Sequence, residues 1–359
     1  MLGSWAHGSR NQIRGGIEMD SVRAVMVGCG GITRAWLKPL ADMSDVEIVG
    51  MVDLIEENAQ QRKKEFELGD AEVSTDFAKT LADLKPDAVF NCTTPGAHYP
   101  LTMQALQNGC HVLSEKPLAD SMEHAREMVA TAEKVGKTFA VIQNRRYDPR
   151  IRRVRQVLDS GTVGQLTTLD GDFYIGAHFG GFRDRMEHVL LLDMAIHSFD
   201  QARYISGADP VAVYCREWNP AGSWYDHDAS AVAVFEMTDG VVYTYRGSWC
   251  SEGLNTTWEC DWRAIGTKGS ACWDGADDLQ IEVVSGDEGF FRPKTTVEPP
   301  EIDLQAKSGA HGGVIREFVD CIKAGTVPET VASDNIKSLA MVFGAIESAQ
   351  TGKRVEIEL

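Results

Sequence analysis

Apolar residues near the start of the chain form a short run that ends at a cluster of glycines. The run Val22–Val27 leads into Gly28–Gly31, and apolar residues then recur from Ile32 to Met43 at helical spacing. This order predicts a buried strand, a tight turn and a helix. Such a turn lets the backbone approach a pyrophosphate, whose charge then faces the free N–H groups at the helix start.

The alternation of short apolar runs and amphipathic stretches continues to about residue 143. Strands are predicted at 46–52, near 73, and at 87–92, 111–113 and 138–142, and helices at 55–67, 77–84, 99–108 and 121–135. This alternation is typical of an α/β fold with a doubly wound parallel sheet, which binds ligands at the carboxyl ends of its strands. The residues after the strands are therefore expected around one site: Gly28–Thr33, Asp53, Thr93–His98, Glu115–Pro117 and Gln143–Arg145.

Asp53 ends the second predicted strand, about 20 residues past the glycine turn, where a carboxylate can accept hydrogen bonds from a ribose 2′-hydroxyl. Leu54 and Ile55 follow it, so no cation is available for a 2′-phosphate. These residues favour NAD over NADP. The glycines alone are also compatible with an ordinary tight turn, because the sixth position of the dinucleotide fingerprint is Thr33 and not Gly or Ala.

The second half has a different pattern, in which strands follow one another with little helix between them. Strands are predicted at 167–174, 211–217, 230–237, 241–249, 258–265 and 270–273. Helices are predicted from the charged stretch 145–155 to an end near Gly161, and at 188–204, 313–324 and 333–350. The sequence predicts a flexible arm at 1–20, a Rossmann dinucleotide-binding domain at 21–143 and a substrate-binding α+β domain at 144–359. The open, mostly antiparallel sheet of the last domain has a broad face, so a homodimer or homotetramer through this sheet is expected.

Charge and cysteine content exclude several classes of partner. The 359 residues carry a net charge of −18, which argues against nucleic-acid binding and against attraction to anionic lipid. No apolar run has the length of a membrane span. The eight scattered cysteines form no CxxC pair and no zinc spacing, so a reducing, cytoplasmic location and no bound metal are expected. Asp226–Asp228 resembles a ligand set but is expected to be a solvated loop.

Three residues are the candidates for catalysis. Lys116 follows a predicted buried strand at the cofactor end of the sheet, where its ammonium can stabilise negative charge on a substrate oxygen. Asp193 and His197 interrupt an apolar run and are four residues apart, so they share one helix face. His197 can take a hydroxyl proton, with Asp193 binding substrate or orienting the ring. The alternative is a buried Asp–His pair that only braces the helix.

Four further residues flank the start of this helix and are candidates for contacts to sugar hydroxyls. They are Tyr174, His178, Arg183 and His188. A surface loop is the alternative for all four. Asp200, one turn beyond His197, is expected to be structural.

Three motifs in this order resemble those of the Gfo/Idh/MocA oxidoreductases, a family that includes glucose–fructose oxidoreductase and inositol dehydrogenase. They are Gly28-Cys29-Gly30-Gly31-Ile32, Glu115-Lys116-Pro117 and Asp193-x-x-x-His197. The resemblance extends from about Val22 to the C-terminus. It implies that Lys116, Asp193 and His197 carry catalysis and that the bond before Pro117 is cis.

The resemblance also implies a cofactor site and a reaction. Thr93, Pro95, His98 and Glu115 would contact the nicotinamide half of the cofactor, and Asn144 is assigned to the same site. The implied reaction is reversible hydride transfer between a carbinol of a sugar, cyclitol or glycoside and NAD, with NADP less favoured. The alternatives are a regulator that binds NAD and sugar without turnover, a reductase of a keto-sugar, and a transferase or lyase that uses the cofactor transiently.

Overall fold

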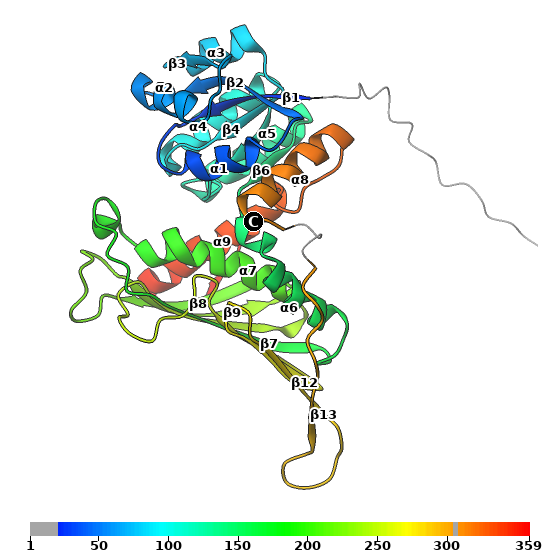
Figure 1. Cartoon of the computed structure of the whole chain (residues 1–359). Helices are drawn as coiled ribbons and strands as arrows, with labels where there is room; N and C mark the ends of the chain where they lie inside the picture. The colour runs from blue at the N-terminus through cyan, green and yellow to red at the C-terminus, as the bar shows by residue number, and fades with distance from the viewer. Residues whose placement is uncertain (1–20, 304–307) are drawn as a thin grey trace, which may run out of the picture.

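The structure is a computed structural model that describes residues 21–303 and 308–359, and the expected arm at 1–20 lies outside the described residues. The described chain forms two sheets, each with helices packed on it (Figure 1). The first sheet and its helices form the upper part of Figure 1, and the second sheet lies below.

The first sheet has six parallel strands in the order β3-β2-β1-β4-β5-β6. The strands are β1 Val22–Val27, β2 Val46–Val52, β3 Glu72–Ser74, β4 Ala88–Asn91, β5 His111–Ser114 and β6 Phe139–Val141. The connecting helices are α1 Thr33–Leu40, α2 Glu56–Glu65, α3 Phe77–Leu84, α4 Pro95–Gln107 and α5 Met122–Val135. This is the doubly wound Rossmann order, and it brings the carboxyl ends of β1 and β4 side by side at the switch point.

A helix from the end of the chain returns to this first unit. Helix α8, His311–Ala324, packs on α1, and Phe318 lies in the same buried cluster as Trp36 and Phe90. The ring centroids of Phe90 and Phe318 are 6.2 Å apart. The boundary at residue 143 stays a prediction. Helix α8, from the end of the chain, completes the core of the nucleotide-binding unit, a contact that no local sequence pattern indicates.

The second sheet has nine strands in the order β14-β13-β12-β11-β7-β10-β9-β8-β15. Its strands are β7 Leu166–Tyr174, β8 Pro210–Trp218, β9 Ser230–Met237, β10 Val242–Ser248, β11 Asp261–Gly266, β12 Gly269–Trp273, β13 Leu279–Val284, β14 Lys294–Thr296 and β15 Val355–Glu356. All neighbours are antiparallel except β7 and β10, which are parallel. The predicted fold class, a Rossmann domain followed by an α+β unit with a mostly antiparallel open sheet, is confirmed.

Helices cover one face of the nine-stranded sheet (Figure 1). They are α6 Pro149–Asp159, α7 Ile196–Ser206 and α9 Ala332–Thr351. Phe199 of α7 packs against Phe235 and Tyr245, with ring centroids 4.8 and 5.3 Å away. Within the described residues no helix lies on the opposite face, where Tyr214 and Val234 remain 51% and 38% exposed.

Two local features differ from the sequence prediction. The helix expected over 188–204 begins with a π-helical turn, η3 Leu190–Ala195, before regular α7. π-Helical turns widen the spacing of side chains and are frequent at functional sites. Strands β13, β14 and β15 were not predicted. Strands β14 and β15 span only three and two residues, which is too short for a recognisable pattern. The alternating Leu279, Ile281 and Val283 were a usable signal for β13.

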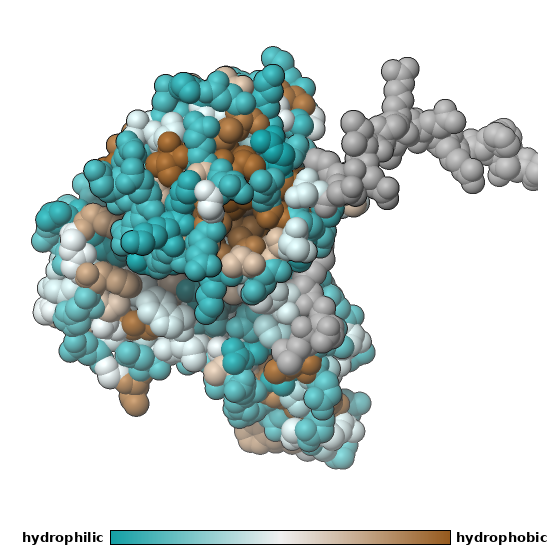
Figure 2. Space-filling model, turned by 45° about the horizontal axis from the view of Figure 1, so that its top comes forward, coloured by the Kyte–Doolittle hydropathy of each residue, from teal (hydrophilic) through white to brown (hydrophobic). Residues whose placement is uncertain are grey.

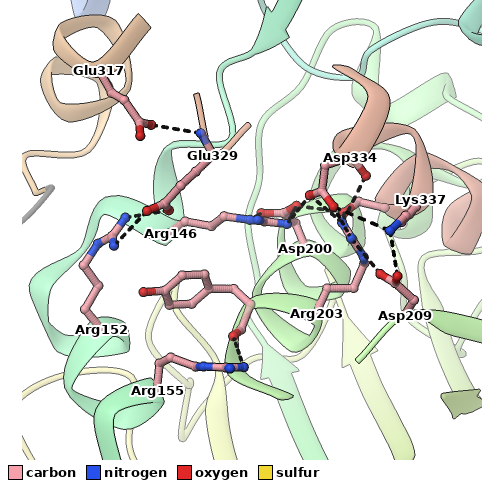
Figure 3. A network of polar contacts seen from close by, with 12 residues as sticks. Arg146, Arg152, Arg155, Asp200, Arg203, Asp209, Glu317, Glu329, Asp334 and Lys337 are labelled. Carbon is pink, nitrogen blue, oxygen red and sulfur yellow. Dashed lines mark hydrogen bonds and ion pairs between the residues drawn. The ribbon is translucent and has the colours of Figure 1, made fainter. Parts of the chain in front are cut away.

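A buried charge network ties α7 to its neighbours (Figure 3). Arg146, in the 3-10 turn η1 Asn144–Tyr147, donates from Nε and Nη2 to the two oxygens of Asp200 at 2.6 and 2.7 Å. Ser338 of α9 donates to the same carboxylate at 2.7 Å. The Asp200 side chain is 2% exposed, so the structural role expected for it is confirmed.

The surface is mostly hydrophilic on the face shown in Figure 2, and hydrophobic residues gather mainly over the nucleotide-binding unit. Within 21–303 and 308–359, no helix combines the length and apolarity needed to cross a bilayer. All eight cysteines are free thiols.

Candidate active site

The glycine turn after β1 needs glycine at one position for steric reasons. Gly28 has φ +86°, and a Cβ there would lie 2.6 Å from the carbonyl carbon of Cys92. Thr33, at the sixth position of the fingerprint, is fully buried and donates its hydroxyl to the Gly28 carbonyl at 2.8 Å. The departure from Gly or Ala therefore has a physical reason, since the hydroxyl of Thr33 braces the turn from inside.

The turn leaves room for a phosphate group. A Cβ placed at Gly30 or Gly31 would meet no atom within 4 Å among the described residues. Helix α1 begins after Ile32, which has no side chain able to cap it. The Arg34 and Ala35 N–H groups bond the carbonyls of Gly31 and Ile32, whereas the N–H groups of Gly30–Ile32 have no partner among the described residues. Open space in front of uncapped N–H groups fits the pyrophosphate of a dinucleotide.

Asp53 lies at the end of β2 beside this turn. Its carboxylate accepts the Cys29 N–H at 2.7 Å and the Ile55 N–H at 2.8 Å. Leu54 and Ile55 are 93% and 57% exposed. An anion flanked by apolar side chains suits a ribose diol and disfavours a 2′-phosphate, so the residues fit NAD.

The variant Asp53→Asn is expected to weaken NAD binding about tenfold, the usual worth of a hydrogen bond to a charged group. It keeps an oxygen for the Cys29 N–H but removes the charge that faces the ribose. The Kd values for NAD and NADP, measured by calorimetry, should therefore move closer together. Asp83→Asn, at an exposed carboxylate near the end of α3, is the control. An unchanged ratio of the two Kd values would exclude Asp53 as the discriminating group.

The loop after β5 carries a buried acid and the candidate lysine. Glu115 accepts the Trp36 indole N–H at 2.8 Å and the Lys116 backbone N–H at 3.1 Å. Burial raises the pKa of the Glu115 carboxyl above its usual value. The Lys116–Pro117 bond is cis, as the resemblance implied. Trp36 of α1 thus fixes the backbone from which the Lys116 side chain projects.

Lys116 reaches helix η3 of the second unit. Its Nζ donates to the Asp193 backbone carbonyl at 2.8 Å and to Oδ1 of the same residue at 3.2 Å. Arg183 approaches the Asp193 carboxylate from the other side, with Nε 2.8 Å from Oδ2. Although burial opposes ionisation, the charges of Lys116 and Arg183 hold the pKa of Asp193 below its usual value. Asp193 is thus an anion held between two cations.

His197 lies one turn further along α7 and is buried. Its Nδ1 has no hydrogen-bond partner among the described residues. Burial and then the charges of Arg145, Lys116 and His311 hold the pKa of His197 well below its usual value, so the ring is neutral. The alternative of a hydrogen-bonded Asp193–His197 pair is wrong, because the Asp193 carboxylate bonds Lys116 and Arg183 instead.

Comparison with known proteins now identifies the family. The family sequence profile described as "Oxidoreductase family, NAD-binding Rossmann fold" matches residues 22–143, and the "GFO/IDH/MocA C-terminal domain" matches residues 151–272. The chain belongs to the Gfo/Idh/MocA family. As a member it is an oxidoreductase with an NAD-binding Rossmann domain, which confirms the predicted enzyme class and cofactor.

Relatives match over nearly the whole chain. Inositol 2-dehydrogenase of Rhizobium meliloti is 25% identical, and the match covers 94% of this chain and 99% of that protein. D-glucoside 3-dehydrogenase of Escherichia coli is 26% identical, and the match covers 96% of this chain and 100% of that protein. The structure of an oxidoreductase from Agrobacterium radiobacter, in complex with NAD+, L-tartaric acid and magnesium, superimposes with a TM-score of 0.81. Its identity is 22%, and the match covers 94% of this chain and 98% of that one.

Other residues that were predicted at the cofactor site of this Gfo/Idh/MocA protein have mixed placements. Thr93 is half-buried and Pro95 exposed at the start of α4, while Asn144 is half-buried beside His311. His98 is fully buried, and its ring nitrogens lie 2.8 Å from the Pro117 carbonyl and 3.0 Å from that of Thr93. His98 therefore joins the loops after β4 and β5 and does not present its ring to a cofactor.

Of the four predicted substrate contacts, the structure brings Arg183 to the Lys116–Asp193 contact. The Arg183 guanidinium lies over the rings of Phe179 and Phe182, 5.0 and 4.8 Å from their centroids. His178 is 60% exposed, stacks on Trp224 and pairs with a glutamate on the neighbouring loop. His178 thus lies at the surface of the same loop, separate from the Lys116–Asp193 contact.

Two of the four predictions are corrected. Tyr174 follows Phe173 on β7, and Phe173 points toward the helices, so Tyr174 points to the opposite face of the sheet. His188 pairs through Nδ1 with buried Glu217 at 2.6 Å, and its Nε2 lies 3.2 Å from Gln350. Its partners make His188 a structural residue at the far end of α9.

Sequence reasoning missed residues that complete the site. His311 begins α8, and its Nε2 lies 3.9 Å from Glu115 Oε1. Arg145 donates to Glu259 Oε1 at 2.8 Å and to the Trp258 carbonyl. Arg145 was expected near the site only as part of the segment after β6. Neither His311 nor Glu259 lies in a motif, so the sequence offered no signal for them.

Proposed function

We propose that this protein is an NAD-dependent dehydrogenase that oxidises a carbinol of a sugar, cyclitol or glycoside. The family assignment supports an oxidoreductase with an NAD-binding domain. Relatives named inositol 2-dehydrogenase and D-glucoside 3-dehydrogenase support a polyhydroxylated substrate. The observation that carries the proposal is the convergence of Lys116, from the nucleotide-binding unit, with Asp193 and His197 of the second unit.

The proposed chemistry divides between the cofactor and the side chains. Bound NAD supplies the acceptor for the hydride of the carbinol carbon. His197, neutral because of burial and neighbouring cations, accepts the hydroxyl proton. Lys116 contacts the same oxygen and stabilises the negative charge that develops on it. Asp193 holds the Lys116 ammonium and the Arg183 guanidinium, so it positions the lysine and leaves the outer edge of Arg183 for substrate hydroxyls.

The decisive experiment is a substrate screen with the purified full chain. NAD is supplied with hexoses, inositols, anhydrosugars, glycosides and their acids, and NADH formation is followed by absorbance. The proposal expects turnover with at least one polyol. NAD binding without NADH formation across the whole panel would support a regulator instead. NADH consumption with keto-sugars but no oxidation of any polyol would support the reductase alternative.

We further propose that the protein is a homo-oligomer that pairs through the uncovered face of the nine-stranded sheet. Apolar residues on this face remain more than one third exposed: Tyr214, Trp218, Val232, Val234 and Val242. Tyr214 and Val234 are directly opposite each other on neighbouring strands, and apolar side chains exposed on an uncovered face are typical of association sites. Light scattering should give a multiple of 39.4 kDa, and Val234→Glu should lower it. A monomer in the unmodified protein would contradict the proposal.

The free thiols support the cytoplasmic location predicted above.

A further inference from the structure

The ring of His197 lacks the usual orienting contact. A histidine that accepts protons is normally oriented through its second ring nitrogen, which donates to a carboxylate or a carbonyl. Here Nδ1 is buried without a partner among the described residues, and Asp193 is occupied by Lys116 and Arg183. Whatever controls the ring must act through packing and charge.

Arg145 and Glu259 extend along the part of α7 that carries His197. The Arg145 guanidinium donates to Glu259 Oε1 at 2.8 Å, and its Nη2 lies 3.5 Å from the Met194 sulfur. The other Glu259 oxygen accepts the side-chain amide of Gln201 at 2.7 Å. Met194, in η3, precedes His197 by three residues, and Gln201, in α7, follows it by four. The Arg145–Glu259 ion pair therefore contacts the chain on both sides of His197, through Met194 and through Gln201.

We infer that Arg145, held by Glu259 across the stretch of helix that carries His197, is a positioning residue for the His197 side chain before substrate binds. The inference rests on the proposed function, in which His197 accepts the hydroxyl proton. The charge effect of this cation is opposite to that of the carboxylate found beside histidine in other sites, since a nearby positive charge disfavours the protonated ring. Glu259 limits this effect, so the ring can still take a proton during the reaction.

Charged groups face His197 from three elements. Arg145 comes from η1, Lys116 from the loop after β5 and His311 from the start of α8. Lys116 is balanced by Asp193, and Arg145 by Glu259. After burial, Arg145 is the largest influence that lowers the pKa of His197. Burial in turn raises the pKa of Glu259, an effect that Arg145 opposes.

The position of Arg145 is fixed by its neighbours in η1. Arg146 is bonded to Asp200 from two nitrogens (Figure 3), and the Tyr147 hydroxyl donates to Glu317 of α8. Arg145 is only 12% exposed at its side chain and Glu259 is 21% exposed. The ion pair is thus part of a rigid segment, and its charge acts on the ring from a constant position.

The test is an NMR titration of the His197 ring in the full chain with labelled histidine, using His197→Gln to assign the signal. This readout needs no substrate, so it stands even if the proposed activity is absent. Arg145→Met removes a neighbouring cation and is expected to raise the midpoint by roughly one pH unit, the low end for a nearby charge. Glu259→Gln leaves Arg145 unbalanced and is expected to lower the midpoint.

Two further variants separate charge from folding. Arg145→Lys keeps the cation and should leave the midpoint near that of the unmodified protein. Arg150→Met removes a guanidinium of α6 that pairs with Asp277 and should change nothing. If the ion pair had only a structural role, Arg145→Met and Glu259→Gln would not shift the titration midpoint of His197 in opposite directions. Unchanged midpoints in both variants, or shifts of the same sign, would overturn the inference.

Once a substrate is found, the same variants make a kinetic prediction. The acid limb of kcat/KM reports the free enzyme's base, which must be unprotonated. A higher pKa of His197 in Arg145→Met moves this limb to higher pH, and Glu259→Gln moves it to lower pH. If the NMR midpoints shift and the limb does not, the positioning role holds and His197 is not the base, so the proposed function fails alone.

Discussion

His197→Gln is expected to reduce kcat/KM by roughly 10²–10⁴-fold, the usual worth of a positioned acid or base. The ring is neutral at the start of the reaction, because burial and the cations around it disfavour protonation. Glutamine has a similar size but cannot accept the hydroxyl proton. NAD affinity should remain within about twofold, since the proposed cofactor contacts lie on the other unit.

Lys116→Met is expected to reduce kcat/KM by a similar factor, because removing one donor from a charge-stabilising site costs roughly 10²–10³-fold. It also leaves Asp193 with Arg183 as its remaining cation. Both effects are measured as initial rates of NADH formation with the substrate found in the screen. His124→Gln and Lys79→Met, at exposed side chains on α5 and α3, are the controls. Rates within a few-fold of the unmodified protein in either active-site variant would refute its assigned role.

Asp200→Ala is expected to be the most damaging single change for stability. Arg146 is 9% exposed at its side chain, and Asp200 supplies both of its close carboxylate contacts. Removing one partner of a buried ion pair leaves an uncompensated charge, which costs roughly 3–5 kcal/mol. The more distant Asp334, 3.5 Å from Arg146, replaces only part of the lost contact. Urea unfolding followed by tryptophan fluorescence should show the lower midpoint.

The matched control for this prediction is Asp277→Ala. Asp277 pairs with Arg150 at 2.8 Å, but its side chain is 83% exposed, and exposed pairs contribute about 0–1 kcal/mol. The two midpoints should therefore differ clearly. Equal midpoints would mean that the Arg146–Asp200 pair contributes no more than a surface contact.

The local chemistry of the first unit could be predicted well from the sequence. A strand of buried residues, a glycine turn and a helix are set by neighbouring residues. The sequence of these three elements over Val22–Thr33 could therefore be predicted without a structure. The position of Lys116 at the end of a buried strand could be predicted for the same reason. Parallel strands share one carboxyl edge, which is why residues from separate segments were correctly expected to meet.

Predictions that depended on which way a side chain points were less successful. Tyr174 and Phe173 are adjacent on β7, and a strand sends neighbouring side chains to opposite faces. Only the burial of Phe173 in the core cluster that also includes the apolar residues of α7 decides that Tyr174 faces away from the helices. His188 was assigned by its proximity in sequence to Asp193, but its ring turns toward buried Glu217.

The sequence by itself determined where the candidate residues lie relative to the local elements. The glycine turn, Asp53 and Lys116 each follow a strand, and Asp193 and His197 lie four residues apart in one helical segment. It determined these because each depends on spacing within a few residues. The tertiary structure alone decided the partners, since Lys116 meets Asp193 across 77 positions and Arg145 meets Glu259 across 114. Such pairs are selected by how two sheets and α8 pack, and this packing depends on the whole core and not on any local pattern.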